Sequence, residues 1–266
     1  MNNEFISIMT ERIVREFDPL QIILFGSQAR GDADQDSDID LLVIFAELTD
    51  KRKAAINIER ALSDVPVAKD IIVSTPEELE RGRTRIGSVL RYAQQEGKTL
   101  WKNLNAAAYS GSAQHTALSN IEVTDAMQTA DRLADTARWL RHAEEDLTTA
   151  ETFLGHPQIP PRQVCWHAQQ AAEKALKAAL IFLQIDFRRT HNLNVLRDLL
   201  PESWQLKTAH PDLSDLTRWA LETRYPEDRQ GVTKAEATEA VEQARSVWTS
   251  VSTELAQHGY HTGQNL

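Results

Sequence analysis

The sequence predicts an α/β (α+β) domain with a mixed sheet, followed by an all-α antiparallel helical bundle. Two observations lead to this fold class. Short apolar runs of strand length alternate with helical segments in residues 1–102, whereas residues 128–266 contain long segments of helical periodicity and no strand-like run. Residues 103–127 are small and polar, with weak periodicity, and we expect them to form a linker.

The first domain should place helices on a small sheet. The segment 21–25 reads QIILF, an apolar run of strand length that Gly26 follows directly, and it is typical of a buried strand. The stretch 76–95 reads as one helix with a weak point at Gly82, and Gly97 ends it. We expect helices at 5–17, 51–62 and 76–95, strands at 21–25, 39–45 and 67–73, and a last edge strand at 98–101.

The second domain should consist of amphipathic helices joined by short connections. Apolar residues recur three and four positions apart from Leu133 to Leu154, which predicts one face of a long helix. Pro160 and Pro161 then begin a helix that extends through Leu183. Further helices are expected at 192–200, 213–223 and 234–257, and such a series packs as an antiparallel bundle.

Composition and charge exclude several classes of protein. The chain of 266 residues has a single cysteine, Cys165, which rules out an intramolecular disulfide framework and a multi-cysteine zinc site. The formal net charge of −10 argues against broad binding to duplex DNA, although a bound cation could reverse the sign locally. We find neither an apolar run of membrane-spanning length nor a secretory pattern, and therefore expect a cytoplasmic protein that does not bind membranes.

The segment 25–43, which reads FGSQARGDADQDSDIDLLV, carries the chemistry of the first domain. Gly26 follows a strand and lacks a side chain, so that a phosphate could approach the backbone closely. Ser27 adds a hydroxyl group and a backbone N–H, and a helix beginning here would favour an anion at its N-terminus. This turn is therefore a candidate phosphate-binding site.

Three aspartates are candidate metal ligands and catalytic residues. Asp38 and Asp40 are two positions apart at the start of a strand, so their side chains project to the same face. Asp70 lies in the next apolar strand and could join them if the two strands are neighbours. Adjacent carboxylates repel each other unless a cation lies between them, and Mg²⁺ prefers oxygen ligands. We therefore expect a Mg²⁺ site.

With these residues in place, the first domain resembles the minimal nucleotidyltransferases of the polymerase-β superfamily. The resemblance rests on Gly26-Ser27, on the segments 29–31 and 37–41, and on their order and spacing. It implies that Gly26 and Ser27 bind a nucleoside triphosphate and that Asp38 and Asp40 bind Mg²⁺. The third carboxylate of the family maps onto Asp70 by strand context, and we expect two further nucleotide contacts, from Arg30 and Ser37.

The second domain resembles HEPN domains in three segments, 168–177, 189–193 and 223–226. HEPN domains are helical bundles, often dimeric, that occur beside minimal nucleotidyltransferases, including in toxin–antitoxin systems. The resemblance implies a possible homodimer through this domain. The ribonuclease form carries an arginine, four to six residues and a histidine, and only Arg162 and His167 have comparable spacing here. A weaker expectation adds Arg189 and His191 as ligand-binding residues.

The expected function is Mg²⁺-dependent transfer of a nucleoside monophosphate, AMP from ATP by preference, to an acceptor hydroxyl. A protein tyrosine, an RNA and a small molecule remain open as acceptors. Three alternatives stay beside this interpretation: an aminoglycoside-type nucleotidyltransferase, a metal-independent HEPN ribonuclease, and a nucleotide-binding regulatory module with little turnover.

Overall fold

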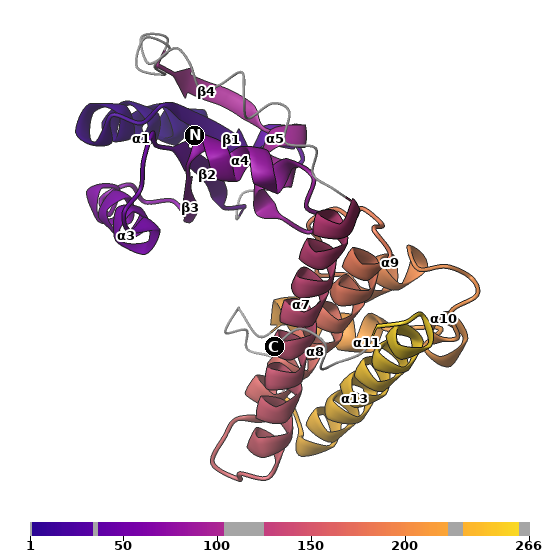
Figure 1. Cartoon of the computed structure of the whole chain (residues 1–266). Helices are drawn as coiled ribbons and strands as arrows, with labels where there is room; N and C mark the ends of the chain where they lie inside the picture. Colours follow the sequence, from indigo (N-terminus) through magenta and orange to yellow (C-terminus); the bar gives the residue numbers. More distant parts are fainter. Residues whose placement is uncertain (1, 34–36, 104–124, 223–230, 261–266) are drawn as a thin grey trace. The chain divides into compact units, whose positions relative to one another are not determined.

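The computed structural model describes residues 2–33, 37–103, 125–222 and 231–260. The chain divides into two compact units, Met1–Glu122 and Val123–Leu266 (Figure 1). Most of the predicted linker and the segment 223–226 lie outside the described residues. In the described parts, no helix is both long enough and apolar enough to span a membrane.

The first unit contains a mixed four-stranded sheet, as the sequence predicts. Strand β1 is antiparallel to both of its neighbours, β2 and β4, whereas β3 pairs in parallel with β2, which gives the order β3-β2-β1-β4. The elements of this unit are α1 (Asn2–Phe17), β1 (Gln21–Phe25), α2 (Gly26–Arg30), β2 (Ile39–Ile44), α3 (Lys51–Ala61), β3 (Lys69–Ser74), α4 (Pro76–Arg83), α5 (Val89–Glu96) and β4 (Lys98–Lys102).

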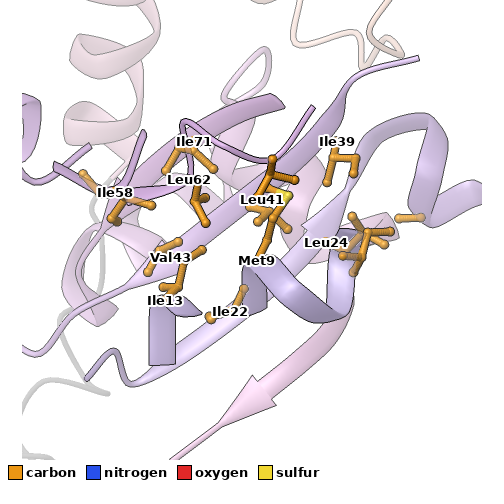
Figure 2. Packing of buried hydrophobic residues seen from close by; sticks show 14 residues of the cluster. Met9, Ile13, Ile22, Leu24, Ile39, Leu41, Val43, Ile58, Leu62 and Ile71 are labelled. Atoms are coloured by element: carbon orange, nitrogen blue, oxygen red, sulfur yellow. The ribbon is translucent and has the colours of Figure 1, made fainter. Parts of the chain in front are cut away.

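Strand β2 is buried on both faces, because helices cover each side of the sheet. One hydrophobic cluster joins Ile39, Leu41 and Val43 to residues of α1 and α3 (Figure 2). The alternate residues Leu42 and Ile44 belong to a second cluster with Ala93 of α5 and with residues of β1. Side chains alternate between the two faces along a strand, so this division shows on which face of the sheet each polar residue of β2 lies.

The prediction of one continuous helix at 76–95 is wrong, because the chain forms two helices there, α4 and α5. Gly87 between them has a φ of 76°, a left-handed conformation that interrupts a helix. Ser88 then caps α5 by accepting a hydrogen bond from the Leu90 N–H. A Cβ atom on Gly82 would lie 2.7 Å from the Leu90 Cβ, so this glycine lets α4 and α5 pack closely.

The second unit is helical and is centred on α8. This helix contacts both α7 and α13, and 14 of its 22 residues are buried. Six of the buried residues are alanines, which allow the neighbouring helices to approach. The elements are α7 (Asp125–Leu154), α8 (Pro161–Phe182), α9 (Leu193–Asp198), α10 (Leu206–Ala209), α11 (Ser214–Thr217), α12 (Trp219–Glu222) and α13 (Lys234–Gln257).

The expected helix at 213–223 is also divided, into α11 and α12. Side chains at the junction are held by neighbouring helices: Thr217 accepts a hydrogen bond from the N–H of Leu193, at 3.1 Å. The guanidinium group of Arg218 lies 3.2 Å from Glu236 of α13 and stacks over the Trp219 ring. These contacts tie the segment to α9 and α13 at the point where the helix is interrupted.

Helix α13 begins and ends with defined capping structures. Thr233 and Glu236 form a reciprocal capping box at its start. At its end, Gly259 has a φ of 87°, and the N–H groups of Gly259 and Tyr260 bond to the carbonyls of Ala256 and Leu255. This is a Schellman motif, in which the left-handed residue is a glycine for steric reasons. It places Tyr260 against the core, where the tyrosine ring contacts Phe182.

Candidate functional site

The candidate site lies where three strand ends meet in the first unit. Strand β1 ends at Phe25, which is the antiparallel partner of Asp40 near the start of β2. Because β3 is parallel to β2, its beginning lies at the same end of the sheet, and Asp70 is in direct register with Asp40. The fold therefore brings Gly26, Asp40 and Asp70 to one end of the sheet, although they are separated in sequence.

The register also decides the face on which the carboxylates lie. Residues in register on adjacent strands project to the same side, and Asp40 shares its face with Leu42. Asp38 lies just before β2 and two residues from Asp40, so the alternation of side chains places it on the same face as Asp40. Asp40 is buried, with 9% of its surface exposed, whereas Asp38 and Asp70 are exposed. The end of the sheet thus carries one buried carboxylate, that of Asp40, with the exposed carboxylates of Asp38 and Asp70 beside it.

Gly26 touches the buried carboxylate directly. It has a φ of 72°, and a Cβ atom placed on it would lie 3.0 Å from the Asp40 Cγ and would overlap Oδ2. A glycine is required here both for the left-handed backbone and for this close approach. The turn from β1 into α2 and the Asp40 carboxylate are consequently parts of one packed structure.

The other predicted nucleotide contacts surround this turn. Ser27 is half-buried in the first turn of α2, and the carbonyl of half-buried Ser37 accepts a hydrogen bond of 3.3 Å from Gln28. Arg30 donates hydrogen bonds to Asp32, at 3.0 Å, and to Glu96 of α5, at 3.2 Å. The bond to Asp32 contributes most to raising the pKa of the guanidinium group, and the bond to Glu96 adds to it. Gln28 and Glu96 were not singled out from the sequence, because single polar residues on helices carry no distinctive pattern.

The donor atoms fit a hard divalent cation. Within the described ranges, no three histidine, cysteine or acidic side chains are gathered as a complete metal-binding group. Two carboxylates in register, with Asp38 beside them, nevertheless supply the oxygen donors that Mg²⁺ prefers. Mg²⁺ is usually held by one or two carboxylates and takes its remaining ligands from water and substrate phosphates. Asp38, Asp40 and Asp70 remain the predicted ligands.

In the helical unit, the two predicted arginine–histidine pairs have different surroundings. Arg162 is exposed at the start of α8. The Nδ1 atom of His167 lies 2.9 Å from Asp146 Oδ1, and the other oxygen of Asp146 is paired with Lys174. The His167 ring also packs edge-on against Trp166. His167 is therefore a half-buried residue at the contact of α7 with α8.

His191 belongs to a second and more deeply buried polar network. Its Nδ1 lies 3.0 and 3.2 Å from the two oxygens of Glu173, which is buried in α8. Lys177 and Gln169 contact the same carboxylate at 2.7 and 2.8 Å. The sequence does contain a trace of this network, since Gln169, Glu173 and Lys177 recur every four residues along α8. Arg189, the other residue predicted beside His191, is exposed.

The fold and these sites define a protein of two domains: a mixed α/β sheet with carboxylates at one end, and an all-helical unit with a buried polar network. Comparison with protein families identifies both. Residues 6–97 match the family model described as a nucleotidyltransferase domain, and residues 136–254 match that of the HEPN domain. The chain thus belongs to the proteins in which a nucleotidyltransferase domain is fused to a HEPN domain.

Individual proteins are similar to part of the chain. A protein of Methanocaldococcus jannaschii that is named as a candidate toxin, MJ1304, is 33% identical over 124 residues, which cover 41% of this chain and 80% of the relative. Two solved structures are also similar. TT1696 from Thermus thermophilus is 30% identical, with 46% of this chain and 99% of that chain covered and a TM-score of 0.39. The archaeal HEPN homologue ST0689 is 24% identical, with 45% of this chain and 97% of that chain covered and a TM-score of 0.36.

Proposed function

We propose that this protein is a Mg²⁺-dependent nucleotidyltransferase that transfers a nucleoside monophosphate, AMP from ATP by preference, to an acceptor hydroxyl. The observation that carries the proposal is the register of Asp40 with Asp70, together with the packing of Gly26 against Asp40. Membership of the nucleotidyltransferase family supports the reaction class.

Each residue has a distinct proposed role. Asp38 and Asp40 hold Mg²⁺, which when bound neutralises the charge of the phosphates and of the carboxylates. Gly26 and Ser27 offer backbone N–H groups to the triphosphate, with Arg30 and Ser37 as further contacts. Asp70 serves as a third ligand or accepts the proton of the acceptor hydroxyl. The hydroxyl oxygen then bonds to the α-phosphorus, and pyrophosphate leaves.

For the HEPN domain we propose a role in substrate binding or dimerisation. The similarity of this chain to a protein named as a candidate toxin supports a link to toxin–antitoxin systems. The acceptor would then be a protein side chain, such as a tyrosine, or an RNA, whereas a small molecule would suit an aminoglycoside-type activity.

Transfer of an α-phosphate label from each nucleoside triphosphate tests this proposal. The protein is incubated with Mg²⁺ and the labelled nucleotide, alone, with cell lysate, and with a panel of small hydroxyl compounds. We expect label on an acceptor and release of pyrophosphate, with Asp40→Asn and Asp70→Asn each slowing transfer by about 10²-fold or more. Asp18→Asn is the matched control, because Asp18 is exposed and its left-handed φ of 45° suits asparagine.

Other outcomes would point to the alternatives. Nucleotide binding without pyrophosphate release from any acceptor would indicate a regulatory module. RNA cleavage in the presence of a chelator, lost in Arg162→Gln or His167→Gln, would indicate a metal-independent ribonuclease. Unchanged transfer in both aspartate variants would refute the assignment of Asp40 and Asp70.

A further inference from the structure

The last turn of α5 is held close to the end of β1. Gly97 directly follows this helix and precedes β4, whose first residue pairs with Leu24 of β1. A Cβ atom on Gly97 would overlap the Ala93 carbonyl and the Ile23 side chain, so the helix end packs tightly against β1. Glu96, the last residue of α5, therefore lies at the end of the sheet where α2 begins.

Helix α5 also covers the face of the sheet that carries the aspartates. Ala93 of α5 packs with Leu42 and Ile44, whereas α1 packs on the opposite face. Asp40 lies on the Leu42 face because side chains alternate along β2, and Asp70 is in register with it. The last turn of α5 and the two carboxylates thus share one end and one face of the sheet.

Arg30 connects α2 to this end of α5. Its Nε donates a hydrogen bond to Asp32 at 3.0 Å, and its Nη1 donates one to Glu96 at 3.2 Å. The side chains of Arg30 and Glu96 are 29% and 23% exposed, so solvent screens this ion pair less than a fully exposed one. In the described parts of the chain, no hydrogen bond of Arg30 uses Nη2.

Two carboxylates on one guanidinium group fix its orientation. Ion pairs near the protein surface add little to stability, but a planar guanidinium held along two of its edges can point in only one direction. The Nη2 edge that remains carries N–H groups in the geometry that suits phosphate oxygens. The fold therefore holds an oriented cation on the face of the sheet where Asp40 and Asp70 lie.

We propose that Glu96 is a positioning residue for nucleotide binding, which together with Asp32 orients Arg30 so that its Nη2 group binds a phosphate of the nucleoside triphosphate. This inference rests on the proposed nucleotidyltransferase function. The triphosphate is negatively charged both before and during transfer, so the contact stabilises the bound substrate and the transition state alike. Its loss should therefore raise KM and leave kcat nearly unchanged.

A double-mutant cycle of Arg30→Gln and Glu96→Gln tests this role. Calorimetric titration with Mg²⁺ and an ATP analogue with a methylene bridge between its α- and β-phosphates measures binding without turnover, and the transfer assay gives KM and kcat. We expect Arg30→Gln to weaken binding about tenfold, as for one charge-assisted hydrogen bond. Glu96→Gln should weaken it about threefold in the wild type and have no effect in the Arg30→Gln background, because it acts through Arg30.

Glu16→Gln is the matched control, because it removes an arginine–glutamate pair, with Arg15, from α1 on the opposite face of the sheet. It should leave binding unchanged, and urea unfolding of every variant separates lost stability from lost binding. If Glu96→Gln does not fold, Asp32→Asn provides the second arm of the cycle, since the Asp32 side chain is 60% exposed.

The outcomes separate this inference from the function on which it rests. A wild-type chain that neither binds nor transfers any nucleotide would refute the proposed function, and the role of Glu96 with it. A wild type that binds and transfers, with the same loss from Glu96→Gln in both backgrounds or no loss in either, would overturn the positioning role alone. A fall in kcat at unchanged KM would also overturn it.

Discussion

At the scale of single residues, Gly26 should be highly sensitive to enlargement. In Gly26→Ala the new methyl group would overlap the Asp40 carboxylate, and the backbone would keep a left-handed φ that costs about 1–2 kcal/mol. We expect lower stability and a loss of nucleotidyl transfer of about 10²-fold or more, because the carboxylate must move. Urea unfolding and the transfer assay measure the two effects.

Gly31 provides the control for that substitution. It also has a left-handed φ, of 87°, but an added Cβ atom would meet no atom within 4 Å. Gly31→Ala should therefore share the backbone cost of Gly26→Ala and keep most of the activity. Equal activity of the two variants would mean that the contact with Asp40 has no importance for the reaction.

The buried Glu173 should make the helical unit sensitive to acid. Burial would raise its pKa, but the hydrogen bond from His191 and the charge of Lys177 outweigh burial and lower the pKa from 4.5 to about 2 in the folded chain. Its stabilising contribution is therefore complete above about pH 4.5 and is lost as the pH falls towards 2. The contribution is about 3 kcal/mol at most, at 1.36 kcal/mol for each pKa unit. Glu173→Gln should therefore be less stable than the wild type at pH 6, and the difference should narrow towards pH 2. Trp204, which is buried in this unit, makes fluorescence a suitable probe.

At the scale of one element, the capping box should contribute to the stability of α13. Thr233→Ala removes the acceptor for the Glu236 N–H and should destabilise the helical unit by about 1 kcal/mol. Thr238→Ala is a suitable comparison, because the Thr238 hydroxyl bonds only to the Lys234 carbonyl within the same helix, and its loss should change stability by less than about 0.5 kcal/mol. Denaturant unfolding of both variants would show whether the cap or the threonine itself matters.

Elements could be predicted from the sequence where one local pattern dominates. The strand at 21–25 and the helix at about 234–257 agree with β1 and α13, because apolar periodicity and, for the strand, the following Gly26 indicate these bounds. The helix at 76–95 failed at Gly87, since a glycine in a helical pattern does not reveal that its φ is positive.

Contacts between elements were harder to predict than the elements. The sequence indicated that Asp70 could join Asp40 if their strands were neighbours, but the parallel register itself depends on how α3 crosses the sheet. The pairing of Arg30 with Glu96, and of His191 with Glu173, joins residues 66 and 18 positions apart. No local periodicity encodes such pairs, because they arise only when the tertiary fold brings the residues together.

For the whole molecule, the two units should respond differently to a nucleotide. Each has its own buried core, so we expect two transitions in calorimetry of the full chain. A Mg²⁺-bound nucleoside triphosphate that does not turn over should stabilise the first unit by about 2.7 kcal/mol at a hundredfold excess over its dissociation constant, and Asp40→Asn should remove this effect. A single unfolding transition, whose midpoint temperature rises as a whole when the nucleotide binds, would show that the two units unfold together.

The burial of α8 has a consequence for the timing of local opening. Its backbone hydrogen bonds are shielded by α7 and α13, so its amide protons should exchange with solvent only when the whole helical unit opens. Glu173 is carried by this helix, whereas His191 lies just before the short helix α9. The carboxylate would then be held in one place on a timescale of hours, while the imidazole that it orients could leave and return many times.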